Sequence, residues 1–312
     1  MSNAQYKGLA AKILENDLLK LTFLPDYGCK LASLLSKKTG REFLFQSAKE
    51  TLEIPPYGAP FSAYDSSGFD EVFPSIDQAP YPYGPWKNLP VPDHGEVWAM
   101  QWESTFAADG KSAKSIVKSE RFPYILSRTA TLENNVILFE YEAENTADEP
   151  FEFIWTPHCL LACSPATHLL IPDGLTQVMT VEHSTKRLGP WGTLHTYPLT
   201  TDVNGRPLDL SATEPVSAQN CEKFYFTAPN TAGWCGIEHA DTGEQLIYEY
   251  PADKVPYLGV WKTQGGYRGD YNIALEPCTG VYDDIYVAHK IRRASAIPPH
   301  GKYTWTLKMT VR

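Results

Sequence analysis

Two strand-like runs joined by a short polar turn constrain the fold of this chain more than any other feature. The runs cover residues 124–131 and 136–144, and Glu133-Asn134-Asn135 lies between them. Two sets of side chains alternate in the second run: Ile137, Phe139 and Tyr141 in one set, and Leu138, Glu140 and Glu142 in the other. Because successive side chains of a strand point to opposite faces, this spacing predicts an antiparallel hairpin.

Strand signals recur along the whole chain, whereas helical ones do not. Short runs rich in branched and aromatic residues occur at residues 18–24, 97–105, 245–250 and 305–312. A turn at residues 146–150 leads into another run at 151–155, which predicts a third strand in a meander. No capped apolar segment with helical spacing extends beyond about three turns. We therefore expect an all-β chain, with residues 1–312 forming one large antiparallel two-sheet sandwich.

The composition favours a globular protein with a neutral partner. Hydrophobic residues make up 43% of the chain and charged residues 21%, which argues against disorder. The formal net charge is −10, and no run of lysine or arginine occurs. These properties argue against nucleic acid or an anionic membrane surface as the main partner. Aromatic residues are numerous, and besides filling a core they offer flat faces on which sugar rings stack.

The chain shows no pattern typical of secretion, membrane insertion or metal binding. Residues 1–7 are polar, and no stretch reaches the roughly 20 apolar residues that a membrane span needs. The six cysteines are scattered, at positions 29, 159, 163, 221, 235 and 278, without the spacing of a zinc site. We therefore expect buried, reduced thiols in a cytoplasmic protein without a metal or cofactor.

Two long irregular stretches interrupt the strand pattern. They cover residues 54–93 and 170–219, and each is too long for an idle connection in a compact domain. Prolines fall mainly between the strand-like runs, which favours shaped loops on a rigid scaffold. We expect each stretch to build a binding rim or a lid.

Three titratable side chains stand at positions typical of catalysis. Glu276 ends an apolar run that Pro277 and Gly280 stop, His94 lies in an Asp-His-Gly turn, and His158 follows an apolar strand-like segment. Two imidazoles and one carboxylate are what proton transfer on a neutral polar substrate requires. The structural alternatives are a solvated turn at Glu276, an exposed imidazole at His94 and a hydrogen-bonded core histidine at His158.

The order of these segments resembles that of the aldose 1-epimerase (galactose mutarotase) family. The similarity rests on residues 93–95, on His158 at the end of a WTPH segment, on residues 256–261 followed by 274–277, and on the proline-glycine turn at 297–303. It covers most of the chain. It implies the β-supersandwich fold and an isomerase that exchanges the α and β anomers of a free sugar.

The resemblance also implies a role for each catalytic candidate. Glu276 would be the base that removes the anomeric proton, His158 the acid that protonates the ring oxygen, and His94 the stabiliser of developing charge. A carboxylate close to an imidazolium would raise the pKa of the histidine above its ordinary value of about 6.5. No metal or cofactor enters this scheme.

Sugar recognition is expected to differ from that of the family. The family carries an arginine ahead of the first histidine, whereas residues 67–74 contain no basic residue, and its substrate-holding aspartate has only Glu222 as a counterpart. We expect six side chains to bind the sugar: Asp70, Glu71, Trp98, Glu222, Trp261 and Lys262. The structural alternatives are loop solvation by the paired acids and core packing of Trp261.

Other functions stay open at the level of sequence. The missing arginine motivates a carbohydrate-binding or sensing protein without catalysis, and the pair Asp70–Glu71 motivates a lyase or hydrolase acting on an oligosaccharide. Lys262 and Arg268 would suit a hexose-6-phosphate mutarotase. The sequence does not specify the sugar or the oligomeric state, although an exposed edge strand would permit a homodimer.

Overall fold

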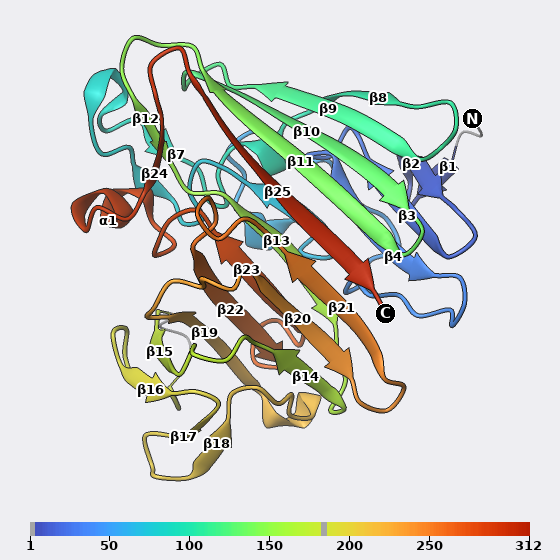
Figure 1. Ribbon diagram of the computed structural model, residues 1–312, viewed down its shortest axis with the longest axis vertical. Coiled ribbons are helices and arrows are strands. Elements are labelled where there is room, and N and C mark those ends of the chain that lie inside the picture. The colour runs from blue at the N-terminus through green and yellow to red at the C-terminus, as the bar shows by residue number, and fades with distance from the viewer. Residues whose placement is uncertain (1–3, 182–185) are drawn as a thin grey trace.

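The computed structural model describes residues 4–181 and 186–312, which form mainly antiparallel strands in two large sheets (Figure 1). In the described residues, the larger sheet has eleven strands, in the order β1 (Ala4–Tyr6), β2 (Leu9–Glu15), β3 (Leu19–Leu24), β4 (Lys30–Ser36), β5 (Phe69–Val72), β13 (Thr156–Ala162), β23 (Tyr271–Cys278), β22 (Tyr257–Gln264), β19 (Asn220–Phe226), β15 (Gln177–Thr180) and β16 (Leu194–Thr196). The second has eight, in the order β14 (Thr167–Leu170), β20 (Trp234–His239), β21 (Glu244–Glu249), β25 (Lys302–Val311), β11 (Val136–Asn145), β10 (Tyr124–Glu133), β9 (Ser112–Lys118) and β8 (Glu103–Phe106). Figure 1 shows this second sheet in front of the larger one, so the predicted two-sheet, all-β architecture is confirmed.

Short elements fill the connections. Three strand pairs stand apart from the large sheets: β6 (Ala79–Pro80) with β7 (Pro90–Val91), β12 (Phe151–Phe153) with β24 (Ser295–Ile297), and β17 (Leu199–Thr201) with β18 (Pro207–Asp209). The short helices are α1 (Ile285–Lys290) and the 3₁₀ turns η1 (Phe61–Ala63), η2 (Gly84–Trp86), η3 (Val97–Ala99) and η4 (Val216–Ala218). No helix in the described part of the chain is long and apolar enough to cross a membrane.

The predicted hairpin is present as β10 and β11. Their register runs from Tyr124 opposite Asn145 to Glu133 opposite Val136, and Asn134 takes a left-handed φ of 52° in the turn, which asparagine tolerates. Ile137, Phe139 and Tyr141 are buried and belong to the apolar core between the two sheets. The alternation in the sequence therefore identified the core face of this strand.

Two local predictions were wrong. The run 97–105 is not one strand, because the 3₁₀ turn η3 occupies its first part and only β8 is extended. Indole N–H groups stabilise this turn: Trp98 donates to the carbonyl of Asp93 at 3.0 Å and Trp102 to that of Val97 at 2.9 Å. The expected meander also fails, since β12 pairs with β24 while β10 and β25 occupy both sides of β11.

The central strands of the larger sheet present two chemically different faces. On β23, Ile273 and Leu275 are part of the core. Because side chains alternate along a strand, Glu276 points to the opposite face. The same phase on β19 places Phe224 in the core and Lys223 on the face of Glu276. The sheet thus carries a polar site on one side while its other side holds the sandwich together.

Candidate functional site

A cavity of about 320 Å³ lies over the polar face of β13, β19, β22 and β23. This volume falls within the usual range for small-molecule sites, about 300–1,000 Å³. Its polar and aromatic lining comes from these strands and from five connecting segments, and it includes Phe61, Ser66, Asp77, His94, His158, Lys223, Trp261, Tyr267, Glu276 and Asp283. All three predicted catalytic residues therefore line the same cavity, although they are distant in the sequence.

Glu276 is fully buried, and its neighbour on β22 is a glycine that leaves room for its carboxylate. Gly259 lies directly opposite Glu276 in the sheet register. A Cβ atom at Gly259 would come within 2.9 Å of the Tyr225 ring and 3.2 Å of the Glu276 carboxylate. The absence of a side chain at this position therefore creates the space in which the carboxylate lies.

The Glu276 carboxylate is fully buried beside a lysine. Lys223 Nζ lies 3.0 Å from Glu276 Oε2 and 2.9 Å from Asp283 Oδ1. Burial raises the pKa of Glu276, and the charge of Lys223 opposes that rise. Neither Glu276 oxygen receives a well-directed hydrogen bond from the described residues. The carboxylate thus keeps acceptor capacity, as a general base requires.

His94 lies in a strained turn that fixes its ring. His94 and Gly95 both have positive φ, 58° and 72°, and a Cβ at Gly95 would lie 2.1 Å from the carbonyl oxygen of Phe73. Asp93 Oδ1 lies 2.8 Å from His94 Nδ1. The Phe61 ring stacks on the imidazole at a centroid distance of 3.9 Å. With Nδ1 held by Asp93, Nε2 is the nitrogen left for a ligand.

Asp93 is itself well anchored. Its Oδ2 accepts a hydrogen bond of 2.9 Å from the backbone N–H of Phe61. Burial alone would raise the pKa of Asp93, but the hydrogen bond with His94 and the backbone donors lower it below its ordinary value. Asp93 is therefore an ionised partner of the imidazole at neutral pH.

His158 behaves differently from the expectation. Its ring lies perpendicular to that of His94, at a centroid distance of 4.7 Å, and its Nδ1 is buried without a hydrogen-bond partner among the described residues. Burial lowers the pKa of His158 well below its ordinary value, and the charges of His94 and Lys223 act in the same direction. The expected upward shift in pKa is wrong, because desolvation and nearby positive charge outweigh any carboxylate.

Aromatic rings form one wall of the cavity. Trp261 on β22 and Tyr267 in the following loop meet edge to face, with centroids 5.7 Å apart. Both rings are only partly buried, so each offers apolar surface to a ligand in the cavity. Of the six predicted sugar-binding residues, Trp261 alone lines this cavity.

Three of the other predicted binding residues are buried and do not line the cavity. Asp70, opposite His158 in the sheet, pairs with buried Lys30 at 3.0 Å, and burial raises the pKa of Asp70 to about 6. Glu71 points between the two sheets and accepts a hydrogen bond from Arg128. Trp98 is fully buried behind the His94 turn.

Glu222 and Lys262 lie on the wrong face of the larger sheet to reach the cavity. They are direct neighbours on β19 and β22, and alternation sends both to the side opposite Lys223. Lys262 Nζ donates to the carbonyl of Leu210 at 3.0 Å, and Glu222 binds Arg187. Burial lowers the pKa of Lys262, against the effect of Glu222.

Several lining residues escaped sequence reasoning. Lys223 is adjacent to the predicted Glu222, and the alternation of β19 was the signal that could have found it. Asp77 and Asp283 come from loops and carry no local pattern. The two irregular stretches do reach the cavity, through Phe61 and Asp77 in the first and Val181 in the second; residues 182–185 of the second lie outside the described residues.

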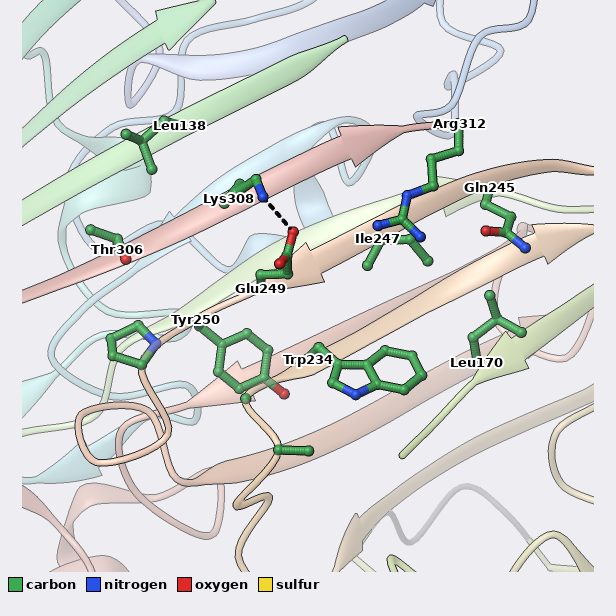
Figure 2. A pocket seen from close by; sticks show the side chains of 13 residues that line it. Leu138, Leu170, Trp234, Gln245, Ile247, Glu249, Tyr250, Thr306, Lys308 and Arg312 are labelled. Atoms are coloured by element: carbon green, nitrogen blue, oxygen red, sulfur yellow. Dashed lines mark ion pairs between the residues drawn. The ribbon is translucent and has the colours of Figure 1, made fainter. Parts of the chain in front are cut away.

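A larger hollow of about 710 Å³ lies on the second sheet (Figure 2). Trp234 and Tyr250 lie side by side in it. Lys308 and Glu249 form an ion pair with each other at 2.8 Å. Among the described residues that line it, none carries an imidazole. Despite its size, it lacks the acid–base groups that the smaller cavity gathers, so the smaller cavity is the candidate active site.

Comparison with known proteins identifies the fold. No family model and no curated protein matches the sequence. A solved structure from Synechocystis sp. PCC 6803 is 17% identical, with a TM-score of 0.73, over 100% of this chain and 99% of that one. A galactose mutarotase-like protein from Lactobacillus casei is 16% identical, with a TM-score of 0.71, over 97% and 100%. An aldose epimerase homologue from C. elegans is 15% identical, with a TM-score of 0.63, over 97% and 98%. Identities this low establish the fold alone: the chain has the β-sandwich fold of the galactose mutarotase-like proteins.

Proposed function

We propose that this protein interconverts the α and β anomers of a free, neutral aldose by acid–base opening of the sugar ring. The observation that carries the proposal is the convergence of Glu276, His94 and His158, from three separate segments, on one cavity of about 320 Å³. Structural neighbours named as mutarotase-like and aldose epimerase proteins support the same class of isomerase.

Glu276 is the base in this scheme. It removes the proton of the anomeric hydroxyl, the bond between C1 and the ring oxygen breaks, and the bonding pair goes to the ring oxygen, which takes up a proton. Rotation about the bond from C1 to C2 and reclosure by the reverse steps give the other anomer. A carboxylate with a raised pKa and unused acceptor capacity suits this role.

We assign the proton donor to His94 rather than to His158. Burial keeps His158 neutral at neutral pH, so it is suited to hydrogen-bond the sugar rather than to carry the proton. His94 has Nδ1 on the Asp93 carboxylate. In such carboxylate–imidazole pairs the carboxylate orients the ring and stabilises the imidazolium. The resemblance gave the role of acid to His158 and that of stabiliser to His94, and our proposal exchanges the two roles.

The charges in the cavity favour a neutral sugar over a phosphorylated one. Three carboxylates line the cavity, from Asp77, Glu276 and Asp283, and Lys223 already contacts two of them. Lys262 faces away, and Arg268 is exposed with its guanidinium donating to the carbonyl of Ser62 at 2.7 Å. A phosphate would therefore meet net negative charge with no uncommitted lysine or arginine among the described lining residues.

Polarimetry on freshly dissolved α-glucose and α-galactose, and on their 6-phosphates, tests the proposal. Wild type should accelerate the change in optical rotation for a neutral sugar, and Glu276→Gln should lose about 10²–10⁴ of that acceleration. Glu222→Gln is the matched control, because Glu222 is equally buried but faces away from the cavity. No acceleration across a panel of aldoses, together with saturable sugar binding, would instead identify a non-catalytic sugar-binding protein.

A further inference from the structure

We infer that Lys223 is a positioning residue that keeps the buried carboxylate of Glu276 ionised and oriented toward the substrate. The inference rests on the proposed function, in which Glu276 is the base. It concerns a residue outside the motifs by which the sequence resembles the mutarotases.

Lys223 is built into the wall of the cavity. It lies on β19, two strands away from Glu276 on β23, with β22 between them, and it is only 7% exposed. Its ammonium bridges the space over Gly259, since Gly259 lies beside Glu276 in the register and has no side chain to fill that space. The glycine thus permits a contact between side chains on non-adjacent strands.

The ammonium is held from two sides. It lies 3.0 Å from Glu276 Oε2 and 2.9 Å from Asp283 Oδ1. Asp283 is rigid, because its Oδ1 accepts a hydrogen bond of 2.6 Å from the Tyr225 hydroxyl and its carbonyl accepts from the backbone N–H groups of Ile76 and Asp77. Asp283 therefore fixes Lys223, and Lys223 fixes one oxygen of Glu276.

Glu276 needs such a partner to act as a base. The titratable groups around it in the described residues are Asp77, His94, His158, Lys223, Tyr225, Cys278 and Asp283. Asp283 adds to the effect of burial in raising the pKa of Glu276, whereas Lys223 is the strongest opposing influence. Without the lysine, burial would leave the carboxyl protonated over more of the pH range and unable to accept the anomeric proton.

Lys223 itself is not suited to transfer protons. Burial alone would lower its pKa, but the carboxylates of Asp283 and Glu276 raise it well above its ordinary value. An ammonium held this strongly is a poor acid near neutral pH. Its effect on the reaction therefore passes through Glu276.

Lys262 provides a matched comparison within the same sheet. It is also buried and also belongs to a central strand, but it lies on the opposite face and is 3.7 Å from its carboxylate partner, Glu222. Substitution of either lysine removes one buried ammonium. Only the substitution at Lys223 should change the titration of Glu276.

The test compares Lys223→Met, Lys223→Arg and Lys262→Met. The titration midpoint of the Glu276 carboxyl is followed by carbon-13 NMR of glutamate-labelled protein, with Glu276→Gln identifying the resonance. Lys223→Met should raise this midpoint by about one to three pH units, the usual effect of an opposite charge at this range. Lys223→Arg should restore most of the difference, and Lys262→Met should leave the midpoint unchanged.

The pH profile of anomer exchange provides the second measurement. For Lys223→Met the low-pH limb should move upward by the same amount, with much of the rate recovered above it. An unchanged midpoint, or a rate loss equal at all pH values, would overturn the inference. If Lys223→Met does not fold, Lys223→Gln, which also removes the ammonium but keeps a polar side chain, must still raise the midpoint. Because NMR needs no turnover, a wild type without mutarotase activity would refute the proposed function while leaving the Lys223 inference decidable.

Discussion

Two fully buried glutamates in this protein show how differently one side chain is used. Glu71 lies between the two sheets and accepts hydrogen bonds from Arg128 at 2.7 Å, from the Tyr141 hydroxyl at 2.8 Å and from the Trp155 indole at 2.8 Å. Glu276 lies over the polar face of the larger sheet, with Lys223 at 3.0 Å and no well-directed hydrogen bond from the described residues. Both carry a basic partner, but only Glu71 has its acceptor capacity filled by protein donors.

The difference separates a structural charge from a functional one. A buried carboxylate with its hydrogen bonds satisfied is stable as it stands and has nothing to offer a ligand. A buried carboxylate with unused acceptor capacity is costly to the fold, and that cost is typical of sites that complete their hydrogen bonds with substrate. On this ground Glu276, and not Glu71, is the candidate for binding and catalysis.

Removal of a hydrogen-bond donor to Glu71 should give the largest effect on stability. Arg128→Met leaves the charge of Glu71 uncompensated in the core and should lower the free energy of unfolding by about 3–5 kcal/mol. Urea denaturation measures this change. Glu276→Gln leaves the ammonium of Lys223 paired with Asp283 at 2.9 Å, so its free energy of unfolding should stay within about 1 kcal/mol of wild type. Equal losses in both variants would remove the distinction between the two glutamates.

Filling the space beside Glu276 should reduce stability less than Arg128→Met does, and it should also reduce activity. Gly259→Ala places a Cβ against Tyr225 and Glu276 and should cost about 1–3 kcal/mol of stability through overpacking, together with a loss of anomer exchange. Gly236→Ala on β20 is the control, since its Cβ would lie 2.7 Å from both the Ile247 side chain and the carbonyl of Leu246, far from the cavity lining. Loss of stability in both, with loss of activity only in Gly259→Ala, is the expected pattern.

The two glutamates also show what the sequence could and could not predict. Alternating patterns identified the hairpin of β10 and β11, and the resemblance to the aldose 1-epimerases implied that Glu276, His94 and His158 act together. Glu276 and His158 were expected at strand ends, but they lie within β23 and β13. The candidates Asp70 and Glu71 looked alike in the sequence, because a pair of acids in an apolar setting does not reveal which neighbours will bind them. The donors to Glu71 come from distant strands, and only tertiary structure brings them together.

A one-residue error in phase explains two of the other misplaced candidates, Glu222 and Lys262. Glu222 and Lys223 are adjacent, and the side-chain period of two sends one to each face of β19, so choosing the wrong one moves the prediction across the sheet. Lys262 fails for the same reason. Asp77 and Asp283 could not be predicted, because loop residues take their positions from backbone contacts such as those from Ile76 and Asp77 to the carbonyl of Asp283.

The pH dependence of stability extends the comparison to the buried imidazole. The folded protein keeps His158 neutral, with its pKa lowered by burial, whereas the unfolded chain binds a proton below about pH 6.5. The unfolded state therefore binds more protons at lower pH, and the contribution of His158 to stability is lost as pH falls below 6.5, by up to about 1.4 kcal/mol per pH unit.

Urea denaturation of wild type and His158→Gln across this range isolates the effect, because other groups titrate in both proteins. The difference in unfolding free energy between the two should change in favour of His158→Gln as pH falls. His300→Asn, at an exposed imidazole, serves as the control. Parallel curves for wild type and His158→Gln would contradict a neutral, buried His158 and would restore it as a proton donor.

The smallest expected effect comes from an exposed arginine near the cavity, and it tests whether the ligand is neutral or phosphorylated. Arg268 is exposed and its guanidinium bonds a backbone carbonyl, so Arg268→Ala should change anomer exchange of a neutral sugar by less than about twofold, as is usual for surface substitutions. A hexose 6-phosphate should be a poorer substrate or competitor than the free hexose in both proteins, since the lining carboxylates repel it. If wild type instead preferred the phosphate, and Arg268→Ala lost that preference, this arginine would have to turn inward to bind the anion. The carboxylates that line the cavity would then not determine the charge of the ligand.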